Sequence, residues 1–161
     1  MRWIWFWGGL SLVLFAGLAV YLLPLQPSVV ALQFTFDPAA FQAVLMAWRP
    51  EGVARFRHHL VPDCALLLCY GIFGYRLVRH TALCAALPTP VRGLLAWAMP
   101  LAAASDAVEN ALHAYLTSGV QEAAPVLYRM AGISSSLKFA LMGVFLVGVL
   151  AARLRRREGA R

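Results

Sequence analysis

Charged residues are scarce in this chain: Asp, Glu, Lys and Arg make up 13% of its 161 residues. Lysine occurs once, at Lys138, and there are only seven acids. Soluble domains carry about 25% charged residues, whereas here 61% of the residues are hydrophobic and the mean hydropathy is +0.71. The composition therefore excludes an ordinary water-soluble globule, and the length suits a single compact unit.

Several catalytic signatures are also missing. The three cysteines form no C-x-x-C pair, which argues against a thiol–disulfide enzyme. The chain has no glycine-rich phosphate loop, no G-x-S-x-G and no H-E-x-x-H. Five of its thirteen arginines lie in the last nine residues, beside long apolar runs. This arrangement is typical of membrane topology, so we expect no nucleic-acid partner.

Long apolar stretches dominate what is present. A helix needs about 20 apolar residues to cross the hydrocarbon core, and four stretches qualify: 3–23, 60–78, 93–116 and 132–152. The sequence therefore predicts an all-α, four-helix transmembrane bundle that forms one membrane domain over residues 1–161. A cleaved signal peptide is the alternative for the first stretch, but its apolar run exceeds the usual 7–15 residues or so, which favours a retained span.

The arginines indicate the orientation, because positive residues stay on the cytoplasmic side. With both termini inside, nine arginines lie on that side and four lie outside. The opposite orientation would translocate the cluster at 153–157. The excess of arginine over lysine suggests a GC-rich bacterial genome. We therefore expect a multi-pass protein of a bacterial cytoplasmic (inner) membrane, with both termini cytoplasmic.

The first outer connection, 24–59, is the longest. Asp37 followed by Pro38 is typical of a helix start. Phe41, Val44, Leu45 and Trp48 then form one apolar stripe, and Pro50-Glu51-Gly52 is expected to end this short amphipathic helix. It would either lie on the membrane surface over the mouth of the bundle or simply pack on the bundle.

Polar residues inside the spans are the most informative feature. A charge near mid-membrane costs about 2.5–3.5 kcal/mol on insertion scales, so such residues commonly mark functional sites. At 100° per residue, the polar side chains of the third span share one face roughly 100° wide. The polar residues of the second and fourth spans fall at a similar depth, so we expect a polar pocket in the outer half of the bundle. The expected catalytic set is Asp106, Glu109, Asp63, Lys138 and His113. The expected substrate-binding set is Asn110, Tyr70, Ser134, Ser135 and His59.

Three acids against one lysine would leave excess negative charge in a low-dielectric site. A raised carboxyl pKa, a bound cation or a cationic ligand would balance it. We expect Asp106 and Glu109 to form an acid/base pair, in a pocket that binds or modifies a membrane lipid or lipid-like small molecule without a cofactor. A divalent metal at Glu109 and His113 is one alternative. A proton- or cation-coupled transport subunit, acting as a homo-oligomer, and a non-catalytic assembly partner are the others. Buried polar groups that merely join helices would produce the same pattern.

The D-x-x-E-N run formed by Asp106, Glu109 and Asn110 lies between an acid in the second span, Asp63, and a lysine in the fourth, Lys138. This pattern resembles a set of uncharacterised small bacterial four-span membrane proteins. The resemblance covers about residues 36–150 and implies a four-span fold, but it implies no activity.

Overall fold

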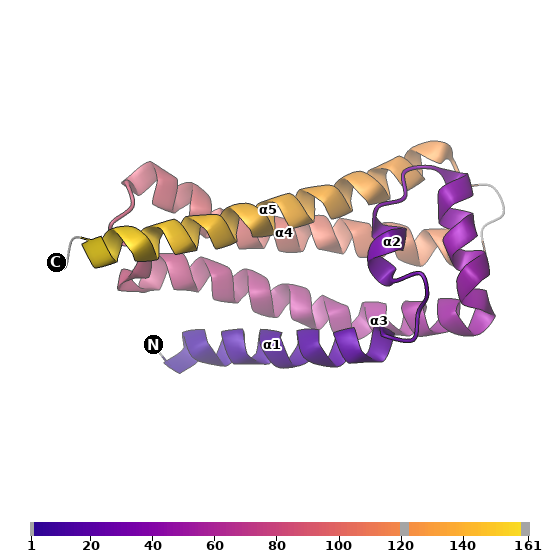
Figure 1. Cartoon of the computed structure of the whole chain (residues 1–161), viewed down its shortest axis with the longest axis horizontal. Helices are drawn as coiled ribbons and strands as arrows, with labels where there is room; N and C mark the ends of the chain where they lie inside the picture. The colour runs from indigo at the N-terminus through magenta and orange to yellow at the C-terminus, as the bar shows by residue number, and fades with distance from the viewer. Residues whose placement is uncertain (1, 120–122, 159–161) are drawn as a thin grey trace.

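The chain folds into helices joined by short connections (Figure 1). The computed structural model describes residues 2–119 and 123–158. Part of the predicted third connection, and Arg161 of the arginines counted for the orientation, lie outside these residues. The elements are α1 (Arg2–Leu22), α2 (Val29–Gln33), α3 (Pro38–His80), the 3-10 helix η1 (Ala82–Cys84), α4 (Thr89–Leu116) and α5 (Pro125–Glu158). The described residues contain no strand, so the predicted all-α class is confirmed.

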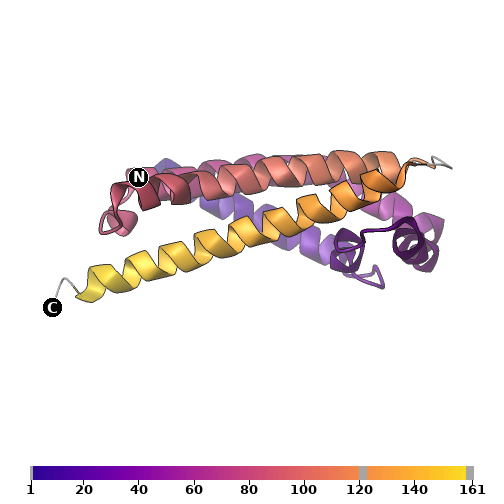
Figure 2. The same cartoon turned by 90° about the horizontal axis from the view of Figure 1, so that it is seen from above.

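Helices α3 and α4 form a central pair, with α1 packed on α3 and α5 packed on α4. Figure 2 shows that α5 is inclined to α4 along its length. Both termini lie at the same end of the molecule as η1, whereas α2 and the start of α3 lie at the other end (Figure 1). The four long helices therefore run alternately up and down between two ends.

The first connection differs from the prediction. Asp37 does cap the helix at Pro38, because its Oδ1 accepts a hydrogen bond from the Ala40 N–H at 2.9 Å. This short helix also ends next to the expected stop at Pro50-Glu51-Gly52, at a kink within α3. Only Arg49 leaves helical geometry (φ 59°, ψ 174°), and the helix resumes at Pro50 and continues to His80. Proline suits the first turn of a helix, where its missing N–H is not needed, so the second long helix begins well before the expected residue 60.

The segment before this kink packs on the end of the bundle. Phe41, Val44 and Trp48 are buried together with residues of α4 and α5, among them Leu116 and Tyr128. This agrees with the packing interpretation of the amphipathic helix. The other ends also shift: α4 begins at Thr89 and α5 extends from Pro125 to Glu158, beyond both predicted limits. The short helix α2 was not predicted.

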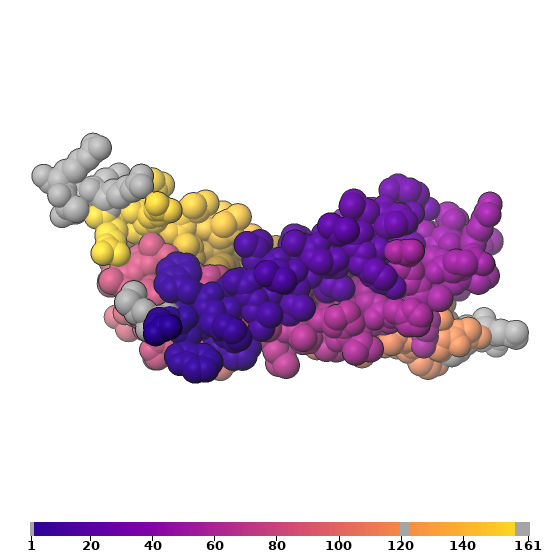
Figure 3. Space-filling view, turned by 90° about the horizontal axis from the view of Figure 1, so that it is seen from below, coloured from indigo at the N-terminus to yellow at the C-terminus, as the bar shows by residue number. Residues whose placement is uncertain are grey.

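Within the described part of the chain, three helices are long and apolar enough to cross a membrane: α1, α3 and α5. Helix α4 falls outside this group because polar residues, including Asp106, Glu109 and Asn110, lower its hydropathy. Large apolar side chains cover the outer surface; for example, Trp3 is 68% and Leu94 77% exposed. Helix α1 lies along one face of the molecule with its outer side uncovered (Figure 3). Exposed apolar surface of this extent is typical of contact with lipid or another apolar partner.

Candidate functional site

The polar side chains of the spans form a layer between two apolar clusters. On the α2 side, one cluster contains Leu60, Leu116 and Ala131. On the other side, a second cluster contains Leu66, Ala102 and Leu141. Each of α3, α4 and α5 therefore passes from apolar to polar to apolar residues at the same level. We call the following residues the polar layer: Asp63, Tyr70, Asp106, Glu109, Asn110, His113, Ser135 and Lys138. The ring of Tyr70 also belongs to the second cluster.

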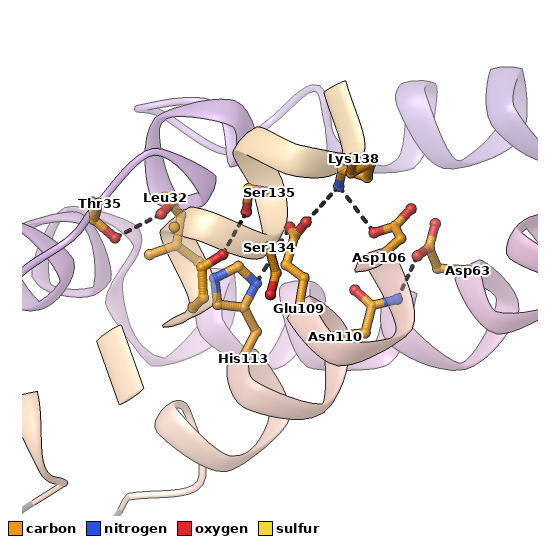
Figure 4. Close-up of polar contacts among 12 residues, drawn as sticks. Leu32, Thr35, Asp63, Asp106, Glu109, Asn110, His113, Ser134, Ser135 and Lys138 are labelled. Carbon is orange, nitrogen blue, oxygen red and sulfur yellow. Dashed lines mark hydrogen bonds and ion pairs between the residues drawn. The ribbon is translucent and has the colours of Figure 1, made fainter. Parts of the chain in front are cut away.

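Lys138 is the centre of the polar layer (Figure 4). Its Nζ on α5 lies 2.9 Å from Asp106 Oδ1 and 2.7 Å from Glu109 Oε2, both on α4. The i, i+3 spacing places these two carboxylates on one face of α4. All three side chains are buried, with Glu109 at 0% exposure. The predicted convergence of the lysine with the two acids of the third span is thus present in the structure.

Two further contacts join α3 to this group. The Tyr70 hydroxyl donates to Asp106 Oδ2 at 3.1 Å, so both oxygens of Asp106 have partners. The Asn110 side-chain amide donates to Asp63 Oδ2 at 2.6 Å (Figure 4). Asp63 is only half-buried and forms the outer edge of the layer. Three helices are therefore connected through one polar layer.

Glu109 and His113 have unused hydrogen-bonding capacity. Glu109 Oε1 lies 3.7 Å from His113 Nδ1, which is too long for a hydrogen bond. Among the described residues, neither Glu109 Oε1 nor His113 Nε2 has a hydrogen-bond partner. Glu109 Oε2 also lacks a partner with hydrogen-bond geometry, and we treat its 2.7 Å approach to Lys138 as an ion pair because the distance is short. Leaving buried polar atoms unpaired costs free energy. Such atoms are therefore candidates for binding a ligand.

Aromatic rings surround His113. Phe41 stacks against its ring at a centroid distance of 5.9 Å, and Phe56 meets it edge-on at 5.7 Å. Both phenylalanines come from α3, one on each side of the kink at Arg49. The sequence did not identify this contact, because periodicity within one helix does not tell where the docked 38–48 segment packs.

Three predicted site residues make their hydrogen bonds outside the ion-paired group: His59, Ser134 and Ser135. His59 Nδ1 contacts the Phe56 carbonyl, and its ring packs against Phe56 at 4.7 Å. Ser135 Oγ donates to Ala131 O at 3.1 Å within its own helix. Ser134 contributes its backbone carbonyl, which accepts from Ser105 Oγ at 2.9 Å. Ser105 was missed by the sequence, yet it links α4 to α5.

The charge of the layer is unbalanced. Asp63, Asp106 and Glu109 supply three carboxyl groups, and Lys138 is the one lysine in the chain. Desolvating an unpaired charge costs several kcal/mol or so. A proton, a cation or a positively charged ligand would remove the excess. In the described residues, no group of three or more His, Cys, Asp and Glu side chains is placed to hold a metal ion; Glu109 and His113 supply two ligands, with the Lys138 ammonium beside them.

One well-formed hollow lies next to the polar layer rather than within it. A groove of about 800 Å³ runs along α3 and α4 near the start of α1, and none of the predicted site residues lines it. The end of the groove that is nearest to the polar layer lies at Cys64 and Ala107. These residues follow Asp63 and Asp106 directly in sequence.

Comparison of the chain with family models, with curated proteins and with solved structures found no match in any of the three. The geometry of the polar layer is therefore the basis for the functional argument.

Proposed function

We propose that this chain is a multi-pass protein of a bacterial inner membrane that crosses the bilayer four times and binds or modifies a lipid or other hydrophobic small molecule at the polar layer. The observation that carries this proposal is the unpartnered pair of Glu109 Oε1 and His113 Nε2 in a buried, negatively unbalanced site. A ligand donor group would satisfy the glutamate oxygen, and a ligand or water would satisfy the imidazole.

A crossing by α4 is supported by the direction of its polar side chains. The helix has 28 residues, a length of roughly 42 Å at 1.5 Å per residue, against a hydrocarbon core of about 30 Å. Its acids are buried against α3 and α5, whereas Leu94, Trp97 and Leu101 are exposed. Lipid would therefore meet apolar side chains on all four helices. The arginine count supports cytoplasmic termini.

The proposed roles follow from the contacts. Both Asp106 oxygens are occupied, so Asp106 would position Lys138 and stay ionised. Glu109 has a free oxygen and would exchange a proton with the ligand as acid or base. Lys138 would set the charge state of both acids, and His113 would pass the proton onward. The half-buried pair of Asp63 and Asn110 would meet the ligand first.

Native mass spectrometry of the gently extracted protein would test this function. We expect the wild-type chain to retain a small molecule that Glu109→Gln loses, with helix content and yield unchanged. Ser136→Ala is the matched control, because Ser136 Oγ donates only to Gly132 O of its own helix; it should retain the molecule. Identical retention by wild type and Glu109→Gln would contradict the proposal. A retained divalent metal that is lost in both Glu109→Gln and His113→Gln would instead indicate the metal alternative.

A non-catalytic role in assembly is the second candidate, and one observation favours it: the satisfied Asp106, held by Lys138 and Tyr70, joins three helices. In that case Glu109→Gln would change only thermal stability, and the protein would co-purify with a larger complex. A transport subunit would instead show uptake driven by a pH gradient in liposomes.

A further inference from the structure

The groove beside α3 and α4 has the size and lining of a binding site. Its volume of about 800 Å³ falls within the range of about 300–1,000 Å³ usual for ligand pockets. Its walls are almost entirely apolar along their length. The lining residues on the central pair include Leu67, Leu68, Gly71, Ile72, Ala103 and Ala104.

Small residues create this hollow. Gly71 on α3 faces Ala103 on α4 so closely that a Cβ added at Gly71 would lie 3.3 Å from the Ala103 Cβ. Ala104 and Ala107 continue the small-residue surface along α4, and both are exposed. The two helices therefore approach each other closely, and no large side chain fills the furrow above their contact.

One end of the groove is cationic. Arg76 and His80 line it near the end of α3, and their i, i+4 spacing places them on one helix face. Both are exposed, and within the described part of the chain neither forms an ion pair with an acid. Trp7 and Trp97 line the groove as well, and tryptophan is enriched where a bilayer meets water. A basic site of this kind between helices suits an anionic lipid headgroup.

The length of the groove matches one leaflet. From Arg76 to Cys64 the wall follows α3 for 12 residues, or roughly 18 Å at 1.5 Å per residue. One leaflet contributes half of a hydrocarbon core of about 30 Å, that is about 15 Å. An acyl chain that starts at Arg76 would thus end near Cys64, just short of the polar layer.

We propose that the groove holds one acyl chain of an anionic phospholipid, with the headgroup phosphate bound by Arg76 and His80. The site lies in the leaflet at the end of the molecule that carries both termini. It is distinct from the chemistry proposed for the polar layer, because its charged end is the far end from Glu109.

The test uses the full chain in nanodiscs made of phosphatidylglycerol and phosphatidylcholine in equal amounts, with native mass spectrometry of the lipids retained on release. Wild type should retain phosphatidylglycerol in preference to phosphatidylcholine. Arg76→Gln should reduce that preference about fivefold, as expected for one basic residue near anionic lipid. Arg79→Gln is the matched control, since Arg79 is exposed at the same helix end but does not line the groove.

A second pair of variants tests the apolar part. Ala104→Trp fills the groove and should abolish retention, whereas Leu101→Trp, on an exposed position outside the groove, should not. Equal losses in Arg76→Gln and Arg79→Gln, or unchanged retention in Ala104→Trp, would overturn the proposal. Glu109→Gln should leave phosphatidylglycerol retention unchanged, so failure of this site and failure of the polar-layer function remain distinguishable.

Discussion

Lys138 is the only lysine in the chain, so its replacement has a definite expected effect on the free energy of unfolding. In Lys138→Met, Asp106 and Glu109 would lose the cation that lies 2.9 and 2.7 Å from them. Breaking a buried ion pair on one side typically destabilises a protein by about 3–5 kcal/mol. We therefore expect a large decrease in the free energy of unfolding, measured by denaturant titration in detergent.

A double variant completes this test. Lys138→Met combined with Asp106→Asn removes one of the two stranded carboxylates and should recover part of the loss, because the two changes are coupled. Strictly additive losses would mean that the close approach of Lys138 and Asp106 contributes nothing to stability.

Glycine at position 74 is required by close packing. A Cβ there would overlap the side chain of Met99 on α4, so Gly74→Ala must displace either Met99 or a helix. Overpacking of this kind costs about 1–3 kcal/mol. Gly143 on α5 is the control, since a Cβ there meets nothing within 4 Å. Thermal denaturation of both alanine variants should show a lower Tm for Gly74→Ala only.

The sequence located some of these residues better than others. Helical periodicity alone placed Asp106, Glu109, Asn110 and His113 on one face, and all four are buried. It did not show that the hydroxyl of Ser135 bonds to its own helix, because serine in a helix can satisfy itself locally without any visible change in pattern.

At the scale of elements, the kink at Arg49 is a strained joint. Its φ of 59° with ψ of 174° lies in a region used almost only by glycine, at a cost of about 1–3 kcal/mol. Arg49→Gly should therefore raise the free energy of unfolding by about 1 kcal/mol, measured in the same denaturant titration. Arg49→Ala is the control and should bring no such gain, because alanine keeps the Cβ. A destabilised glycine variant would show that the arginine side chain is needed.

Arginines also hold the ends of helices together. Arg55 donates to the Tyr21 carbonyl at the end of α1, and Arg57 donates to the Ala114 carbonyl near the end of α4. Arg92 likewise donates to the Val78 carbonyl near the end of α3. Cations are favourable at helix C-termini, where carbonyls lack partners. These residues entered the sequence argument only as indicators of orientation, and their structural contacts depend on neighbours that a single sequence does not reveal.

For the whole molecule, the number of crossings can be measured by labelling single cysteines with a membrane-impermeant maleimide. Burial raises the pKa of the Cys84 thiol, which lowers its reactivity, but Cys64 is exposed, so all three native cysteines are first replaced by alanine. In intact spheroplasts, Ser118→Cys should react, whereas Ala86→Cys and Arg155→Cys should react only after permeabilisation. Labelling of Ser118→Cys and Ala86→Cys on the same side would mean that α4 does not cross.

The all-helical class and the alternating directions of the four long helices were predictable. Long apolar runs and short connections leave few alternatives for a helical chain. The start of the second long helix was not, since Pro50 is compatible both with the end of one helix and with the first turn of the next. The docked segment before it depends on contacts with Leu116 and Tyr128, far away in sequence.

The position of the polar layer between two apolar clusters has a consequence for how the helices are aligned. Lipid tails are as apolar as leucine. Apolar contacts alone would therefore let neighbouring helices slide past one another at little cost in free energy. A shift of α5 by one turn, about 5.4 Å, would break at least one of the two ion pairs that Lys138 makes with Asp106 and Glu109. The ion pairs of the polar layer thus favour one vertical register of α4 and α5.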